Sequence, residues 1–266
     1  MMRQLGKQKR LDRLFKIHGR AFIVPVDDLL ISGVGCQLVQ YKEKIPLIAD
    51  LPIDAVLGFP GVFNQFYNEL NNKSWILNLT TSTFRNEHTY KRLSLSLENA
   101  ISVGCDAVAV HVNITADNEG IMIQNLASTS CECQRYGIPL MAIIYVRNLD
   151  AEGKDNNYLD LKRDNNSEYT QMVTHACRVA VELGADIIKT NYTGSADSFS
   201  NVIYAAGDVP VVIAGGEKVS ESAALSDIKG ALEAGASGIC FGRNFFYRDD
   251  LILFSKKVRK LLDENT

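Results

Sequence analysis

The stretch LGADIIKTNYTG, residues 183–194, decides the fold. A helical pattern ends at Gly184, a buried run follows at residues 186–190, and a polar turn comes directly after it. The same order recurs in VGCDAVAV (103–110) and AGASGICF (234–241). A glycine at the end of a helix commonly adopts a left-handed conformation. The repeated order of helix, glycine, small residue and buried strand predicts helices that alternate with parallel strands.

Eight short apolar runs lie along the whole chain. They are rich in Val and Ile and do not alternate with polar residues, which is typical of strands buried on both faces of a parallel sheet. The runs cover residues 21–26, 55–59, 75–79, 107–112, 140–145, 186–190, 209–214 and 238–241. Helical patterns that each stop at a glycine cover residues 90–103, 118–136, 168–183 and 222–234.

Eight units of about 30 residues fill a (β/α)8 TIM barrel of about 250 residues. The chain has 266 residues and no linker or change in composition, so we predict one α/β domain over residues 1–266. An open doubly wound sheet is the alternative. It is disfavoured because the first turn, VDDLLISGVG, is not a dinucleotide-binding fingerprint. Residues 149–166 are the least regular stretch and predict a long loop after the fifth strand, either a lid or a solvated surface loop.

Composition excludes several classes of protein. Apolar residues make up 46% of the chain, charged residues 22%, and the net charge is −3, which argues against disorder and against nucleic acid as a partner. No apolar run approaches the roughly 18–20 residues that span a bilayer. The basic N-terminus has no apolar centre, unlike a secretory signal. Six cysteines lack metal-binding or redox spacing, so we expect free thiols, no metal and a cytoplasmic location.

Active sites of TIM barrels lie at the C-terminal ends of the strands. The polar and glycine residues that follow the predicted strands are therefore the candidates for a site. In chain order they are Asp27, Asp28, Asn78, Thr80, His111, Asn113, Tyr145, Arg147, Lys189, Gly215, Gly216, Lys218, Gly242 and Arg243.

Lys189 is the most informative candidate, because it ends a run that should be wholly buried. Burial disfavours the charged form of lysine, and a neutral amine forms Schiff bases with carbonyl groups. A lysine paired with a carboxylate is the alternative. Tyr145 ends the neighbouring strand, where a phenol can transfer protons to the reacting carbons, unless it is an ordinary rim tyrosine.

The other candidates predict substrate contacts. Glycines after strands seven and eight, with Arg243, predict a phosphate site, and tight turns are the alternative. Of Asp27 and Asp28, we expect one to face the barrel interior as an acid/base and the other to serve as a cap. His111 and Arg147 are candidate substrate ligands. The alternative for His111 is a buried core histidine whose hydrogen bonds are made within the protein.

Longer stretches resemble class I aldolases of the DeoC/LacD family, over nearly the whole chain to about residue 247. They are GKQKRLDRLF, FIVPVD, GCDAVAVHVNI, YGIPLMAIIYVR, VELGADIIKTNYTGSADSF, PVVIAGGEK and GASGICFGRNFF. The HVN and D-SF segments favour the branch of the 2-amino-3,7-dideoxy-D-threo-hept-6-ulosonate synthases over the fructose-bisphosphate branch.

The resemblance implies roles for individual residues. Lys189 matches the Schiff-base lysine, Tyr145 the proton-transferring tyrosine and Asp27 the first-strand acid/base. The segments that bind the donor's phosphate match Gly215, Gly216, Lys218, Gly242 and Arg243. The family uses no metal or organic cofactor and commonly forms homo-oligomers, including decamers.

The resemblance also implies the reaction. A phosphorylated keto-sugar donor, either a six-carbon deoxy-keto sugar phosphate or dihydroxyacetone phosphate, is joined to an aldehyde. L-Aspartate 4-semialdehyde is the expected aldehyde, and the product is a seven-carbon amino-keto acid of an aromatic or aminobenzoate pathway. The chain has Asp27-Asp28-Leu29 where the family usually has Asp-His-Gly, which predicts a changed contact with the donor.

Three other functions stay open at this point. The first is a fructose-bisphosphate aldolase, and the second is a deoxyribose-phosphate or autoinducer-type aldolase or thiolase. The third is a barrel that binds sugar phosphates without catalysis.

Overall fold

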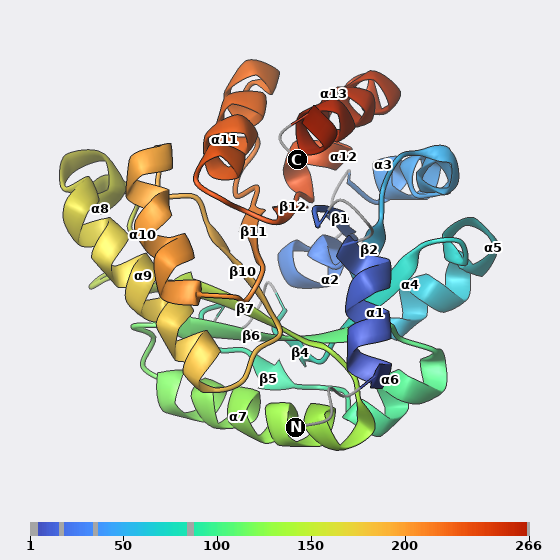
Figure 1. The fold of residues 1–266 in the computed structure, drawn as a ribbon, viewed down its shortest axis with the longest axis horizontal. Helices are drawn as coiled ribbons and strands as arrows, with labels where there is room; N and C mark the ends of the chain where they lie inside the picture. The colour runs from blue at the N-terminus through green and yellow to red at the C-terminus, as the bar shows by residue number, and fades with distance from the viewer. Residues whose placement is uncertain (1–4, 16–18, 34–36, 84–87, 265–266) are drawn as a thin grey trace.

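Eight parallel strands close into a barrel in the order β1-β12-β11-β10-β7-β6-β3-β2 (Figure 1). This computed structural model describes residues 5–15, 19–33, 37–83 and 88–264. The barrel strands are β1 (Ala21–Pro25), β2 (Ala55–Gly58), β3 (Ser74–Asn78), β6 (Ala107–Ile114), β7 (Leu140–Val146), β10 (Ile187–Asn191), β11 (Val211–Ala214) and β12 (Gly238–Cys240). The predicted TIM barrel is confirmed, and the open sheet is wrong.

Helices surround the barrel (Figure 1). They are α1 (Leu5–Phe15), α2 (Asp28–Ser32), α3 (Gln37–Lys44), η1 (Pro46–Asp50), α4 (Pro60–Gln65), α5 (Tyr67–Leu70), α6 (Leu97–Val103), α7 (Glu119–Tyr136), α8 (Leu159–Asp164), α9 (Asn166–Glu182), α10 (Ala196–Ala206), α11 (Glu221–Glu233), α12 (Arg243–Phe246) and α13 (Leu251–Glu264). The glycines that end four predicted helices all have positive φ: Gly104 (+96°), Gly137 (+66°), Gly184 (+82°) and Gly235 (+105°).

Two segments differ from the sequence prediction. Residues 90–96 are not helical, because β5 (Arg92–Leu93) pairs antiparallel with β4 (Thr80–Thr81) and forms a hairpin after β3. The helix begins at Leu97, where the Ser96 hydroxyl accepts a hydrogen bond from the Asn99 amide. The stretch 149–166 is not a plain loop, since it holds α8 and the strand β9 (Asp155–Asn156), which pairs with β8 (Asn148–Leu149).

The barrel interior follows the two-residue period of its strands. Apolar side chains fill the half nearer the strands' N-terminal ends, and they include Ile23, Leu57, Ile76, Ala109, Met141, Ile143, Ile187 and Val212. Side chains two positions beyond several of these residues therefore also point inward, at the other end of the barrel. That end is where polar groups replace the apolar ones.

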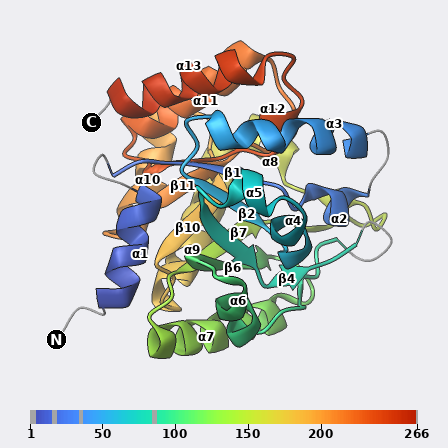
Figure 2. The same cartoon turned by 90° about the vertical axis from the view of Figure 1, so that its right-hand side faces the viewer.

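Helix α1 covers the N-terminal end of the barrel, on the left in Figure 2, whereas α2 and β4 lie at the right. In α1, Leu14 and Phe15 pack against the apolar side chains of the barrel interior. Lys7 of α1 pairs with Asp186 at 2.8 Å, and that carboxylate also accepts a hydrogen bond from the Leu140 amide at 2.9 Å. The N-terminal end is therefore closed by packing and ion pairs, which leaves the opposite mouth open to substrate.

The described part of the chain contains no helix with the length and apolarity of a transmembrane span. Five cysteines are free thiols, at positions 105, 131, 133, 177 and 240. Cys36 lies outside the described residues.

Candidate active site

Lys189 and Tyr145 lie on neighbouring strands at the mouth of the barrel. Strand β10 pairs with β7, and Lys189 lies opposite Ile143, two residues before Tyr145. Only 7% of the Lys189 surface is exposed. Asp27 follows β1 and interacts electrostatically with Lys189. The structure thus brings together the three residues that the sequence predicted to carry the chemistry.

The sulfur of Cys240 is a further neighbour of the Lys189 amine, and the two groups form a hydrogen bond. Burial by itself lowers the pKa of Lys189, but interactions with Cys240, Tyr145 and Asp27 raise that pKa overall. Burial also raises the pKa values of Cys240 and Tyr145, so both groups stay protonated at neutral pH. Asp27 is therefore the counter-charge available to Lys189. Sequence reasoning missed Cys240, because it belongs to an apolar strand pattern.

A chain of hydrogen bonds fixes Asp27. The Asn78 amide nitrogen donates to Asp27 Oδ2 at 3.0 Å, and the Asn78 oxygen accepts from the Thr80 amide and hydroxyl at 3.1 and 3.0 Å. The His111 amide donates to Thr80 Oγ1 at 2.9 Å. Burial raises the pKa of Asp27, and the Lys189 charge and the Asn78 hydrogen bond oppose that rise. Asp28 begins α2, so Asp27 is the aspartate that faces Lys189.

The His111 ring lies edge-on to the Tyr145 ring, with centroids 5.0 Å apart. Its Nε2 is 3.0 Å from Asn113 Oδ1, and the Asn113 amide nitrogen donates to the Thr89 carbonyl at 2.6 Å. Nε2 must therefore be the donor, which leaves Nδ1 as an unprotonated acceptor. Burial and the nearby Lys91, Arg147 and His88 hold the pKa of His111 far below its usual range, so the ring is neutral.

The loops after β11 and β12 meet through Asn244, which is buried. Its amide nitrogen donates to the carbonyls of Gly215 and Glu217, both at 2.6 Å, and its oxygen accepts from the Val219 amide at 3.0 Å. Gly216 has φ +61°, which favours glycine, and a Cβ at Gly242 would make a tight contact of 3.1 Å with Pro25 Cγ.

Sequence reasoning missed Asn244, although the triplet Gly242-Arg243-Asn244 is plain in the sequence. Arg243 is half-buried beside these loops, whereas Lys218 is exposed at their edge.

Arg147 forms an ion pair with Asp155 of β9, and 12% of its side chain is exposed. The hairpin of β8 and β9 therefore supplies a carboxylate that already balances the charge of this predicted ligand. Among the described residues, no group of three or more His, Cys, Asp or Glu side chains is placed to hold a metal ion.

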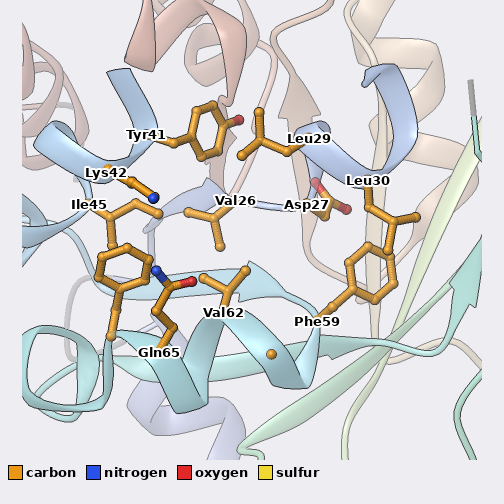
Figure 3. A pocket seen from close by; sticks show the side chains of 12 residues that line it. Val26, Asp27, Leu29, Leu30, Tyr41, Lys42, Ile45, Phe59, Val62 and Gln65 are labelled. Carbon is orange, nitrogen blue, oxygen red and sulfur yellow. The ribbon is translucent and has the colours of Figure 1, made fainter. Parts of the chain in front are cut away.

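A pocket of about 320 Å³ opens beside Asp27, between the end of β1 and helices α2, α3 and α4 (Figure 3). Its walls are mainly apolar, and Lys42 and Gln65 add polar groups. Tyr41, 2% exposed, also lines it, and its hydroxyl has no hydrogen-bond partner within the described ranges. Leu29 and Leu30 of α2 form part of the pocket's apolar wall, and Leu29 stands where the resemblance predicts a glycine.

Known proteins match this chain over most of its length. The sequence profile described as DeoC/LacD family aldolase matches residues 21–248. The chain belongs to the DeoC/LacD family of aldolases.

Relatives named 2-amino-3,7-dideoxy-D-threo-hept-6-ulosonate synthase occur in Archaeoglobus fulgidus and Halobacterium salinarum. They are 34% and 33% identical, over 100% and 92% of this chain and 94% and 87% of theirs. A relative from Streptomyces griseus, named 2-amino-4,5-dihydroxy-6-oxo-7-(phosphonooxy)heptanoate synthase, is 33% identical over 94% of this chain and 89% of its own.

Solved structures agree with this assignment. An archaeal fructose 1,6-bisphosphate aldolase superposes with a TM-score of 0.84 at 28% identity, over 97% of this chain and 99% of its own. Another was solved with its catalytic lysine bound to the carbinolamine intermediate, and it has a TM-score of 0.81 at 27% identity over the same shares. The protein is a class I aldolase, and the prediction of a non-catalytic barrel is wrong.

Proposed function

We propose that this aldolase joins a phosphorylated keto donor to L-aspartate 4-semialdehyde and releases a seven-carbon amino-keto acid. The donor is dihydroxyacetone phosphate or a six-carbon deoxy-keto sugar phosphate. The observation that carries the proposal is the inward convergence of Lys189, Tyr145 and Asp27 at one mouth of the barrel. Relatives in this family are named for seven-carbon 2-amino products, which favours this acceptor and a role in an aromatic or aminobenzoate pathway.

In the proposed reaction, the Lys189 amine attacks the ketone carbon of the donor, and loss of water from the carbinolamine leaves an iminium ion. The iminium takes up the electron pair when a C–H or C–C bond at the adjacent carbon breaks, and an enamine results. The enamine carbon bonds to the aldehyde carbon, and the new alkoxide takes a proton. Water then hydrolyses the iminium, which releases the product and the free amine.

Tyr145 and Asp27 transfer the protons in this scheme. Burial keeps the Tyr145 phenol protonated, so it is ready to donate a proton to a leaving or newly formed oxygen. Burial brings the pKa of Asp27 upward, which suits a carboxylate that takes a proton from the attacking Lys189 amine and returns it later.

The phosphate of the donor would bind where Gly215, Gly216, Gly242 and Arg243 meet, with Lys218 at the edge. Glycines allow the backbone to approach phosphate oxygens closely, and a guanidinium can contact two of them. Binding energy at this remote group would hold the ketone carbon against Lys189. His111 Nδ1, as an unprotonated acceptor, would receive a hydrogen bond from a substrate hydroxyl.

Borohydride trapping tests the proposal. The protein is incubated with dihydroxyacetone phosphate, and separately with fructose 1,6-bisphosphate, then reduced, and the modified peptide is identified by mass. We expect an adduct on Lys189. The variant Lys189→Met should keep its fold and lose turnover by about 10³-fold or more. Lys257→Met, on the outer helix α13, is the control that should retain activity. Near-normal activity of Lys189→Met would reject the mechanism.

Fructose-bisphosphate cleavage is the second candidate, because the superposed archaeal structures carry that name. Rapid turnover of fructose 1,6-bisphosphate without any semialdehyde would favour it. We also propose a cytoplasmic enzyme that forms a homo-oligomer, and light scattering on the purified protein tests its subunit number.

A further inference from the structure

The barrel topology places a second group of basic side chains opposite the loops proposed to bind phosphate. In the closed order of strands, β6 and β3 lie across the barrel from β12 and β11. The hairpin of β4 and β5 follows β3 and carries Lys91 beside β5. Strands β10 and β7, which hold Lys189 and Tyr145, and β1, which Asp27 follows, lie between the two sides. A substrate that spans the mouth would therefore meet Lys189 near its middle.

Lys91 is a lysine that is only 1% exposed. Its amine donates to Ser82 Oγ at 2.6 Å and lies 3.3 Å from His88 Nδ1. The ammonium group has three protons, so these two neutral contacts leave one donor without an acceptor in the described part of the chain. The hairpin is held in place by Asn113, which donates to the Thr89 carbonyl at 2.6 Å.

Charged groups of both signs surround Lys91. The charged and titratable groups that act on it are Arg147, Asp27 and Asp155, with His88 in contact. Asp155 is already paired with Arg147, and no carboxylate among the described residues lies within ion-pair distance of Lys91. Burial, followed by the repulsion of Arg147, lowers the pKa of Lys91 to about 7. A buried lysine that has no carboxylate in ion-pair contact within the described ranges gains stability when an anion joins it.

We propose that Lys91 and the adjacent Arg147 form a subsite for the anionic end group of the acceptor aldehyde. This inference rests on the proposed function, since it concerns the second substrate of that reaction. The phosphate of the donor and the anion of the acceptor then bind on opposite sides of the mouth, and the two reacting carbons meet above Lys189. A carboxylate and a phosphate both carry the negative charge that this subsite would bind. The kinetic experiment distinguishes between these two anions.

Steady-state kinetics with dihydroxyacetone phosphate as donor tests the subsite in the wild type and in Lys91→Met. The acceptors are L-aspartate 4-semialdehyde, glyceraldehyde 3-phosphate and uncharged glycolaldehyde. We expect the KM for an anionic acceptor to rise about 10- to 100-fold in Lys91→Met, with little change for glycolaldehyde. The KM should rise more for one of the two anionic acceptors, L-aspartate 4-semialdehyde or glyceraldehyde 3-phosphate. That acceptor carries the anion that the subsite binds.

Two control variants test whether the effect requires the loss of a positive charge at position 91. Lys91→Arg keeps a positive charge and should keep the KM within about threefold. Lys7→Met removes a buried lysine at the closed end of the barrel and should leave the acceptor KM unchanged. Because the pKa of Lys91 is about 7, the wild-type KM for the anionic acceptor should rise above pH 7 as the amine loses its proton. Lys91→Arg should lose this pH dependence.

The inference can fail separately from the proposed function. Thermal stabilisation by L-homoserine, the unreactive alcohol analogue of the semialdehyde, measures acceptor binding without turnover and should be lost in Lys91→Met. The subsite would be overturned if L-homoserine stabilised the wild type and Lys91→Met equally. It would also be overturned if the KM of Lys91→Met rose equally for charged and uncharged acceptors. Absence of any borohydride adduct in the wild type would instead reject the proposed function.

Discussion

At the scale of single residues, the site depends on burial and on a few hydrogen bonds. Lys189, Tyr145 and Asp27 lie close together in a largely dry barrel mouth, where each charge strongly affects the others. Asn78 donates the hydrogen bond that holds Asp27 and lowers its pKa. Together with burial and the charge of Lys189, this asparagine therefore contributes to the pH range in which Asp27 can accept a proton.

Replacement of Asn78 by alanine tests this role. Loss of the hydrogen bond removes an effect that lowers the pKa of Asp27, so the pKa should rise. A hydrogen bond to a charged group is worth about 1.5 kcal/mol or more, which corresponds to about one pH unit. The acidic limb of the pH profile of kcat/KM should move to higher pH by about that amount. An unmoved limb, with activity lowered equally at every pH, would assign Asn78 a purely structural role.

At the scale of elements, the loops after β11 and β12 are joined by one side chain. Asn244 sits in α12 and binds the carbonyls of Gly215 and Glu217 and the Val219 amide in the preceding loop. Arg248, one turn later, donates to the Asn244 side chain and to the Val219 carbonyl. The proposed phosphate subsite is therefore a single unit, although its two halves are far apart in sequence.

The variant Asn244→Ala should separate the two loops. It leaves the partly buried carbonyls of Gly215 and Glu217 without their donor, so the free energy of unfolding should fall by about 1–3 kcal/mol in urea denaturation. The KM for a phosphorylated donor should rise about tenfold, which corresponds to about 1.4 kcal/mol. Asn201→Ala, on the exposed face of α10, is the matched control. Unchanged donor KM in a destabilised Asn244→Ala protein would show that the asparagine supports the fold alone.

At the scale of the whole molecule, stability and catalysis belong to opposite ends of the barrel. Helix α1 closes the N-terminal end, where Leu14 is fully buried against the interior cluster. Ion pairs of Lys7 with Asp186 and of Arg13 with Asp106 hold the helix there. The other mouth carries the polar residues, so changes at one end should leave the other largely unaffected.

The substitution Leu14→Ala tests this division. A fully buried leucine truncated to alanine costs about 2–5 kcal/mol of unfolding free energy. Chemical denaturation should show this loss, whereas kcat per folded molecule should stay within about twofold of the wild type. Leu5→Ala, in the same helix but 81% exposed, should change the unfolding free energy by less than about 0.5 kcal/mol. A large fall in kcat would show that α1 also shapes the active mouth.

The sequence by itself determined the barrel and the placement of Lys189, Tyr145 and the pair Asp27-Asp28 at one end of it. This was possible because buried parallel strands, helix-ending glycines and the two-residue period of strands are local properties of the chain. The helix expected at residues 90–96 failed because the partner of β5 is β4, about ten residues earlier in the chain, and local periodicity contains no information about that pairing.

Only the tertiary structure decided which side chains surround those residues. Cys240 has the sequence pattern of an apolar strand residue, Asn244 that of a helix start and Lys91 that of a solvated helix face. Cys240 and Asn244 acquire their partners, Lys189 and Gly215, from distant segments. Lys91 meets Ser82 and His88 because the chain turns back on itself between β4 and β5. Closure of the barrel creates these contacts, and burial gives them their strength, because the low dielectric of the interior exists only once the chain has folded.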